Sequence, residues 1–281
     1  MSFTISYKNL TATISQKGAE LISFKKENTE YIWEGNPEFW GKHSPVLFPI
    51  VGTLKNNTYT YNGKEYSLSR HGFARDHEFE VYQFDKESIT FSLQSSSETF
   101  QNYPFVFELR ITYLLTHNGL KVTYEVFNNN DFDMPFSIGG HPAFALGKAF
   151  EDYSLQFESD TTLKSYFLSN DLVSDDFQEI HLDEQLLKLT YSLFEKDALI
   201  IKELKSKSIF LMNEGETLLK FNFDDFPNFG IWTKEKAPFL CLEPWFGYSD
   251  PTTSSGNIME KQGIQILKPN AIFNASFSIQ V

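Results

Sequence analysis

The sequence predicts an all-β protein, a large antiparallel β-sandwich, and three observations point to it. Apolar and polar residues alternate with a period of two in many short segments, as they do in half-buried strands. The pairs Asn62-Gly63 and Asn118-Gly119 each separate two such segments, and Asn-Gly favours a tight hairpin turn. Helical periodicity is scarce, and only residues 36–40 and 184–189 are expected to form short helical turns.

Strands are expected along the whole chain. Each expected segment is apolar or alternating and is bounded by turn-forming residues. In chain order the segments are Phe3–Lys8, Leu10–Ser15, Glu20–Lys25, Thr58–Tyr61, Lys64–Leu68, Phe79–Phe84, Ile89–Gln94, Phe105–Leu115, Lys121–Val126, Tyr153–Phe157, Leu199–Leu204, Ile209–Met212, Leu218–Phe223, Ile264–Leu267 and Ile272–Val281.

The segment 105–115 shows the alternation most clearly. Leu109 and Ile111 fall on one face and Arg110 falls on the other, as expected for a strand with one buried face. A second alternating run follows Asn118-Gly119. These two runs are therefore expected to form a hairpin whose two turn residues both have positive φ.

The acidic stretch from Asp171 to Asp183 is the most loop-like part of the chain. We expect a solvated surface loop, with an insertion or a lid as the alternatives. No linker, low-complexity tract or internal repeat interrupts the sequence. Residues 1–281 are therefore expected to form a single domain.

Composition limits the classes of function. The 281 residues are 41% hydrophobic and include 29 Phe and 13 Tyr, which is ample for a core and excludes a disordered chain. The formal net charge of -13 repels phosphate backbones, so no nucleic-acid partner is expected. No apolar run reaches about 18 residues, so no membrane partner is expected either.

Cys241 is the one cysteine, so no intrachain disulfide can form, which fits a reducing compartment. The N-terminal residues lack the basic and apolar regions of a signal peptide, and we expect a cytoplasmic protein. Leucines flank Cys241, so it is expected to be buried and not to act as a nucleophile.

Three segments far apart in the sequence each place a proton-transfer residue among glycine, proline and aromatic residues. They are Arg70–Arg75, Gly139–Phe144 and Cys241–Phe246. Histidine exchanges protons near neutral pH, and a carboxyl group does so when burial raises its pKa. If a β fold brings the three segments together, they form an acid–base pocket able to hold a sugar ring.

Glu243, His141 and His71 are the candidate catalytic residues. Glu243 follows an apolar run and is expected to end a buried strand, where desolvation raises its pKa towards that of a general base. Pro142 restricts His141 to extended backbone, and the two preceding glycines would permit a bulge. Arg70 is expected to lower the pKa of His71. The alternatives are a paired or solvated carboxylate and histidines with structural roles in the core or a loop.

Arg75 and Asp197 are candidates for binding a sugar. The Arg75 guanidinium suits two hydroxyl groups or a phosphate, and Asp197 would accept hydrogen bonds from hydroxyls. A surface salt bridge and a turn residue are the respective alternatives. Aromatic candidates for stacking on a pyranose, with core packing as the alternative, are Trp232, Phe246, Trp245 and Phe144.

Common cofactor and hydrolase motifs are missing. The chain has no G-x-x-x-x-G-K-[ST], G-x-G-x-x-G, H-E-x-x-H or G-x-S-x-G. The other four histidines lack metal-ligand spacing. No metal and no cofactor are expected.

Taken in order, the segments resemble the aldose 1-epimerase (galactose mutarotase) superfamily, and within it the LacX-like branch. The resemblance extends over almost the whole chain. It rests on Leu47–Gly52 (LFPIVG), His71–Arg75 (HGFAR), Gly139–Phe144 (GGHPAF) and Cys241–Gly247 (CLEPWFG). It implies a galactose mutarotase-like supersandwich with an open cleft that binds an aldohexose.

The resemblance also implies roles for the candidates. Glu243 would be the base, His141 the acid, and His71 would hold and polarise the sugar. An aspartate would bind hydroxyls; Asp197 is the best match, with Asp183 as the alternative. The implied reaction is the cofactor-independent interconversion of the anomers of galactose or glucose, free or as the 6-phosphate, with the sugar as small-molecule partner of a monomer or homodimer.

One departure from the superfamily concerns phosphate. Many relatives carry an arginine close to the LFP segment, and some of them use it with a second arginine on a sugar phosphate. Here Gly52 is followed by Thr53-Leu54-Lys55. A phosphate clamp would therefore need Arg75 and a lysine.

Two other functions stay open from the sequence. A glycoside hydrolase or lyase would use Asp197 and Glu243 as paired carboxylates, about 5 to 9.5 Å apart. A sugar-binding or regulatory protein would bind without turnover, because a fold does not by itself decide function.

Overall fold

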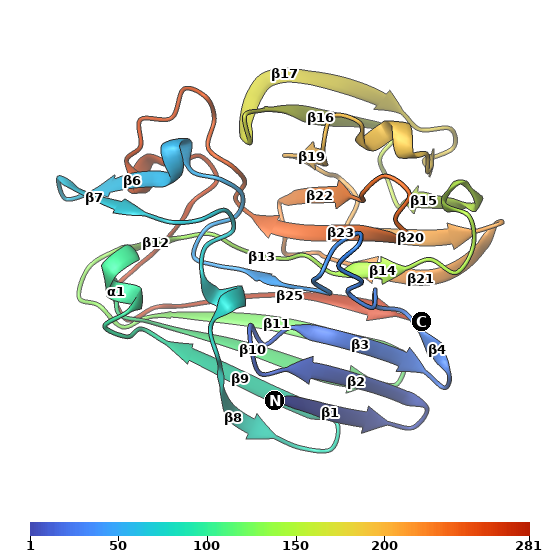
Figure 1. Cartoon of the computed structure of the whole chain (residues 1–281), viewed down its shortest axis with the longest axis horizontal. Helices are drawn as coiled ribbons and strands as arrows, with labels where there is room; N and C mark the ends of the chain where they lie inside the picture. Colours follow the sequence, from blue (N-terminus) through green and yellow to red (C-terminus); the bar gives the residue numbers. More distant parts are fainter.

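The computed structural model describes residues 1–281, and antiparallel β-sheet dominates it (Figure 1). The one α-helix is α1, Thr99–Asn102. Single turns of 3-10 helix connect strands at η1 (Lys55–Asn57), η2 (Ala74–Asp76), η3 (Phe150–Asp152), η4 (Tyr191–Phe194) and η5 (Ile258–Glu260). None of the helices is long and apolar enough to cross a membrane.

A nine-stranded sheet forms one main layer, in the order β18-β15-β20-β21-β25-β11-β10-β9-β8. In chain order its strands are β8 (Glu80–Phe84), β9 (Ser88–Gln94), β10 (Phe107–Thr116), β11 (Gly119–Asn128), β15 (Tyr153–Phe157), β18 (Leu186–Lys188), β20 (Ser208–Asn213), β21 (Glu216–Asn222) and β25 (Ile272–Gln280).

An eight-stranded sheet forms the second main layer, in the order β17-β16-β19-β22-β23-β13-β5, with β14 paired to β23 beside β13. Its strands are β5 (Val46–Leu47), β13 (Ile138–Gly140), β14 (Ala143–Ala145), β16 (Thr162–Ser169), β17 (Leu172–His181), β19 (Leu199–Ile201), β22 (Asn228–Trp232) and β23 (Phe239–Phe246).

Three smaller sheets complete the chain. A four-stranded sheet joins β1 (Ser2–Tyr7), β2 (Leu10–Ser15), β3 (Leu21–Lys26) and β4 (Thr29–Glu30). The two-stranded sheets join β6 (Thr58–Tyr61) to β7 (Lys64–Ser67) and β12 (Met134–Phe136) to β24 (Gln265–Leu267).

Aromatic side chains fill the space between the layers. Phe221 of the nine-stranded sheet lies with its ring centroid 6.0 Å from Phe229 of the eight-stranded sheet. On the other side, Phe3 of β1 meets Phe91 of β9 at 5.8 Å. One contiguous cluster of 56 buried residues includes Phe91, Phe221 and Phe229, and the partly buried Phe3 packs against it. A single core therefore joins the three sheets.

The two Asn-Gly pairs behave differently. Asn62 and Gly63 have φ of 49° and 75°, as predicted for a tight hairpin turn. The second pair also lies at a hairpin, because β10 and β11 pair as predicted. The turn residues differ from the prediction: Gly119 belongs to β11 and pairs with Thr116, and neither Asn118 nor Gly119 has positive φ. A Cβ on Gly119 would lie 2.0 Å from the carbonyl oxygen of Ile279, so the close approach of β25 requires glycine there.

The acidic stretch was also predicted wrongly, because residues 172–181 form β17 and not a loop. β17 pairs with β16 at the edge of the eight-stranded sheet, where Figure 1 shows the hairpin at the top of the view. Half of the β17 residues are exposed, and charged side chains are common on edge strands, which accounts for the acidic composition. Residues 184–189 contain β18 and no helical turn. Trp40 N–H does donate to Asn36 O at 2.9 Å, which closes the expected turn at 36–40.

Candidate active site

β23 runs through the middle of the eight-stranded sheet, and its alternation separates two sets of side chains. Glu243 and Trp245 share one face with Cys241, since residues two apart on a strand point the same way. Leu242 and Phe246 point to the other face, and Leu242 belongs to the core. Glu243 lies within β23 and is 1% exposed, so it does not end the strand as predicted, although it is buried.

His141 reaches Glu243 because of a gap between two short strands. β13 ends at Gly140 and β14 begins at Ala143, and both pair with β23. Gly139 pairs with Trp245 and Ala143 with Cys241, so His141 stands opposite Glu243. The glycines form no bulge; the strand simply breaks at His141 and resumes after Pro142.

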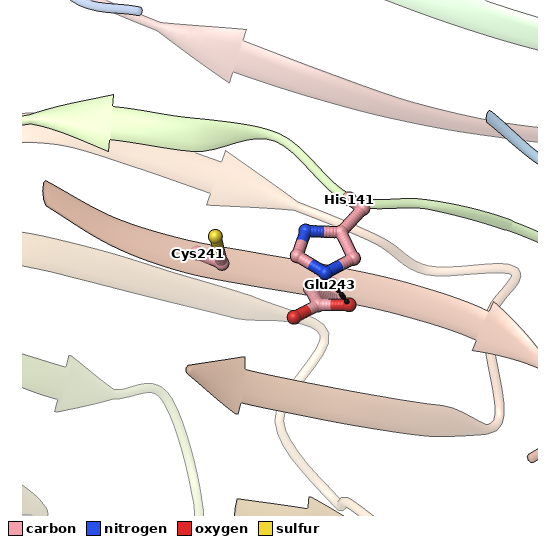
Figure 2. Close-up of side chains that lie close together, drawn as sticks. All are labelled: His141, Cys241 and Glu243. Carbon is pink, nitrogen blue, oxygen red and sulfur yellow. Dashed lines mark ion pairs between the residues drawn. The ribbon is translucent and has the colours of Figure 1, made fainter. Parts of the chain in front are cut away.

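The His141 Nε2 lies 3.3 Å from Oε2 of Glu243, and Figure 2 shows the imidazole over the carboxyl group with Cys241 beside them on β23. Burial lowers the pKa of His141 to about 3. Burial also raises the pKa of Glu243 well above its usual range, with Asp197 adding to the rise and Arg70 opposing it. Both shifts favour the uncharged forms, a neutral imidazole beside a protonated carboxyl group, so the pair holds one proton.

His71 enters the same site on a strained turn. Its φ is 68°, and Gly72 follows with φ of 71°. A Cβ on Gly72 would lie 2.3 Å from the carbonyl oxygen of Phe48, so glycine is required both by its conformation and by space. The turn places the His71 ring 5.9 Å from the His141 ring, edge to face.

The contacts of His71 determine which ring nitrogen carries the proton. Gly52 N–H donates to Nδ1 at 3.1 Å, and Arg70 Nε lies 3.2 Å from Nε2. Burial, with His141 and the arginines, lowers the pKa of His71 well below its usual range, so the ring is neutral. A neutral imidazole accepts at only one nitrogen. The buried backbone N–H of Gly52 needs its acceptor, so Nδ1 accepts and Nε2 carries the proton.

These groups open into one cavity of about 480 Å³, within the range of small-molecule sites. Its lining combines aromatic walls with charged groups. The lining residues are Trp40, Val51, Gly52, Arg70, His71, Arg75, His141, Leu168, Asp197, Ala198, Ile200, Trp232, Glu243, Trp245 and Ser249.

Comparison with known proteins agrees with this architecture. Residues 1–267 match the family model described as aldose 1-epimerase. The chain belongs to the aldose 1-epimerase family. It is 38% identical over 275 residues to the plasmid-borne protein LacX of Lactococcus lactis subsp. lactis, an alignment that covers 92% of both chains.

Solved structures with the same fold are galactose mutarotase-like proteins. A galactose mutarotase related enzyme from Lactobacillus acidophilus superposes with a TM-score of 0.93 at 38% identity, over 100% of this chain and 97% of that one. A galactose mutarotase-like protein from Lactobacillus casei gives 0.92 at 31% identity, over 100% and 99%. The predicted galactose mutarotase-like β-sandwich is confirmed.

In this aldose 1-epimerase family chain, seven of the nine candidate residues line the cavity: Glu243, His141, His71, Arg75, Asp197, Trp232 and Trp245. Phe246 does not, because its ring lies 5.1 Å from Phe226 and 4.9 Å from Phe273, away from the cavity. Phe144 is likewise fully buried against Phe221. The alternation of β23 places Trp245, and not Phe246, beside Glu243.

Asp197 and Arg75 are anchored differently. Asp197 has φ of 83°, and its Oδ1 accepts from the N–H of Ala198 at 2.7 Å, so the turn holds one carboxylate oxygen and not the other. Arg75 donates from its terminal nitrogen to the carbonyl oxygen of Arg70 at 2.8 Å, while its Nε makes no hydrogen bond but lies 3.7 Å from Oδ2 of Asp76 in an ion pair. Both side chains thus retain hydrogen-bonding capacity towards the cavity.

Three further residues of the epimerase family chain line the cavity, although the sequence did not predict them as site residues. Trp40 stacks on His141, with ring centroids 4.8 Å apart at 26°, and no pattern near it indicated a site. Arg70 joins Arg75 in the cavity and reaches Asp171 at the tip of the β16–β17 hairpin at 3.1 Å. Ser249 accepts from Thr53 N–H at 2.9 Å. Two of the three arginines of the chain therefore line the cavity.

Cys241 lies close to the acid–base pair but in different surroundings. One ligand-type atom from each of Cys241, His141 and Glu243 lies within 4.8 Å of the others. The thiol packs in an apolar cluster with Trp33 and Ala143. Burial raises the pKa of Cys241 well above its usual range, so the thiol stays protonated and is a poor nucleophile.

Proposed function

We propose that this protein is an aldose 1-epimerase, a mutarotase that interconverts the α and β anomers of an aldohexose such as galactose or glucose. The observation that carries the proposal is the buried His141–Glu243 contact at 3.3 Å. The two groups share one proton inside a cavity walled by Trp40, Trp232 and Trp245. Ring opening of a hexose needs one proton removed and one proton supplied, which such a pair can do.

The mechanism uses the pair in its two tautomers. Glu243 takes the proton of the C1 hydroxyl while His141 gives a proton to the ring oxygen, and the C1–O5 bond breaks to leave an aldehyde. Rotation about C1–C2 presents the other carbonyl face. The steps then reverse, so both protons return to their starting groups and no net change in protons or electrons occurs.

The other cavity residues have binding roles in this proposal. His71 donates from Nε2 to a sugar oxygen, Asp197 accepts from hydroxyls, and Arg75 donates to hydroxyls. Trp232 packs against the apolar face of the ring. The enzyme works without a cofactor, as a cytoplasmic monomer or homodimer. The guanidinium groups of Arg70 and Arg75 also suit a 6-phosphate, so phosphorylated sugars belong in the test.

The test is proton NMR of freshly dissolved α anomers of galactose, glucose and their 6-phosphates, with and without the protein. A faster approach to anomeric equilibrium for at least one sugar is expected. At anomeric equilibrium, saturating the NMR signal of one anomer should then reduce the intensity of the signal of the other anomer.

Two outcomes would contradict the proposal, and each would indicate another function. Binding of a sugar without faster exchange for any of the four would indicate a non-catalytic carbohydrate-binding or regulatory protein. Release of a reducing sugar from a glycoside, without anomer exchange, would indicate a hydrolase that uses Asp197 and Glu243.

A further inference from the structure

The indole of Trp245 occupies a slot that two glycines leave open. Gly139 on β13 and Gly230 on β22 lie on either side of β23. A Cβ on Gly139 would lie 2.6 Å from Cδ1 of Trp245, and one on Gly230 would lie 2.4 Å from Cη2. Neither glycine has positive φ, so space for the indole, and not backbone conformation, requires them. Packing therefore fixes the orientation of the ring.

The N–H of this fixed indole has no partner within the protein. Trp245 is 5% exposed, and its buried Nε1 donates to no acceptor. Buried indole N–H groups are usually bonded, as in Trp33, which donates to the carbonyl oxygen of Trp40 at 2.9 Å. An indole N–H can only donate. Glu243 lies on the same face of β23 but completes no hydrogen bond with it, so an acceptor that enters the cavity would satisfy the N–H.

The carboxyl group of Glu243 lies beside it on the same strand face. Its Oε2 is buried and lies 3.3 Å from His141 Nε2, without a further hydrogen-bond partner. Trp245 and Glu243 lie two residues apart on β23 and line the same cavity, so their polar groups are neighbours. A hydroxyl group can donate to a carboxylate and accept from an N–H at the same time. One sugar hydroxyl between them would satisfy both.

We propose that the indole N–H of Trp245 donates a hydrogen bond to the anomeric oxygen of the sugar, the oxygen that Glu243 deprotonates. This inference rests on the proposed mutarotase function. As the O1–H bond breaks and its proton passes to Glu243, negative charge develops on O1 until C1–O5 breaks and O5 receives the proton of His141. A donor already fixed in a buried site stabilises that charge without reorganising.

Trp245→Phe tests the donor, because phenylalanine keeps an aromatic ring in the slot and removes only the N–H and part of the ring. The turnover number for anomer exchange should fall about 10²-fold, with the melting temperature recorded to verify folding. An unchanged turnover number in the folded variant would overturn the proposal.

A ligand comparison separates the hydrogen bond from packing. A 1,5-anhydro sugar lacks the anomeric oxygen. Trp245→Phe should weaken binding of the parent aldose about tenfold and leave the affinity for the 1,5-anhydro sugar unchanged. Trp232→Phe is the matched control, because loss of a stacking surface should weaken both ligands alike. Equal losses for both ligands in Trp245→Phe would overturn the proposal.

The same experiments distinguish this inference from the proposed function. If the wild type exchanges no anomers, the mutarotase function fails, while the affinities of the two ligands still report on the hydrogen bond. If the wild type is active and both ligands weaken equally in Trp245→Phe, only the role of Trp245 fails.

Discussion

His141 Nε2 lies 3.3 Å from Oε2 of Glu243, and the two residues come from strand positions that face each other across β23 and the break between β13 and β14. Both side chains are buried, and burial shifts their pKa values in opposite directions. Burial disfavours a charge on either group, so the empty pair favours neutral histidine with protonated carboxyl. In the proposed reaction, the bound sugar supplies the contacts that make the charged tautomer accessible.

Glu243→Gln should lower the rate of anomer exchange by about 10²- to 10⁴-fold, since a carboxamide cannot accept the proton. Glutamine has nearly the shape of the protonated glutamic acid, so the far-ultraviolet circular dichroism should be unchanged. His141→Asn should give a loss of similar size. Measurement by NMR of both variants and the double variant checks that the pair acts as a unit. An unchanged rate in Glu243→Gln would exclude Glu243 as the base.

Exchange should depend on pH as a bell-shaped profile after subtraction of the uncatalysed rate. The active pair holds one proton, so activity is lost on the acid side when His141 also becomes protonated, near its pKa of about 3. It is lost on the alkaline side as pH passes the raised pKa of Glu243. Measuring kcat/KM against pH checks both limbs. An alkaline limb centred at the ordinary pKa of a glutamate would contradict the assignment.

The same shift of Glu243 affects stability with a definite sign. A carboxyl group whose pKa is raised by folding stabilises the fold below its unfolded pKa, and that stability is lost as pH rises through the folded pKa. Glu243→Gln removes this loss of stability at high pH, because glutamine does not titrate. The variant should therefore unfold at a higher temperature than the wild type on the alkaline side, with little difference at acidic pH, as checked by thermal unfolding at several pH values.

Gly230→Ala should disturb Trp245, because the new methyl group would lie 2.4 Å from Cη2 of the indole. Overpacking of this kind costs about 1 to 3 kcal/mol, and the displaced ring should also reduce anomer exchange. Gly147→Ala is the matched control, since Gly147 is exposed, has no positive φ and would have no atom within 4 Å of the added methyl group. Urea unfolding and the NMR assay should separate the two variants.

Much of the fold follows from local patterns that the sequence displays. β2, β6 and β15 begin and end where alternation predicts, because each has one buried face. β17 was missed, because an exposed edge strand carries the polar residues that also characterise loops. The short strands β13 and β14 are interrupted by His141 and Pro142, and such strands exist only through their pairing with β23.

The residues of the candidate site were predictable where a proton-transfer side chain lies within a short distinctive motif, as for Glu243, His141 and His71. Phe246 was misplaced although the sequence contains the signal: it stands three residues after Glu243, and alternation puts it on the opposite face. Trp40 and Arg70 enter the cavity through tertiary contacts with His141 and Asp171. Such contacts between distant segments leave no periodic trace in the sequence.

A buried ion pair fixes one wall of the cavity. Lys261 Nζ lies 3.0 Å from Oδ1 of Asp250, and the side chains are 2% and 3% exposed. Asp250 also accepts from the N–H of Lys55 at 3.0 Å and donates its own N–H to Thr53 O at 2.8 Å. These contacts hold the segment that contains Gly52, whose N–H fixes the His71 ring.

Lys261→Met should destabilise the protein by about 3 to 5 kcal/mol, since it leaves the buried Asp250 charge unpaired. It should also raise KM for the sugar, because the segment that orients His71 loosens. Lys268→Met is the control: Lys268 pairs with Asp133 at 2.8 Å, but its side chain is 74% exposed, and such surface pairs contribute about 0 to 1 kcal/mol. Urea unfolding midpoints and KM values compare the two variants. Equal effects would show that the Lys261–Asp250 pair does not hold the cavity wall.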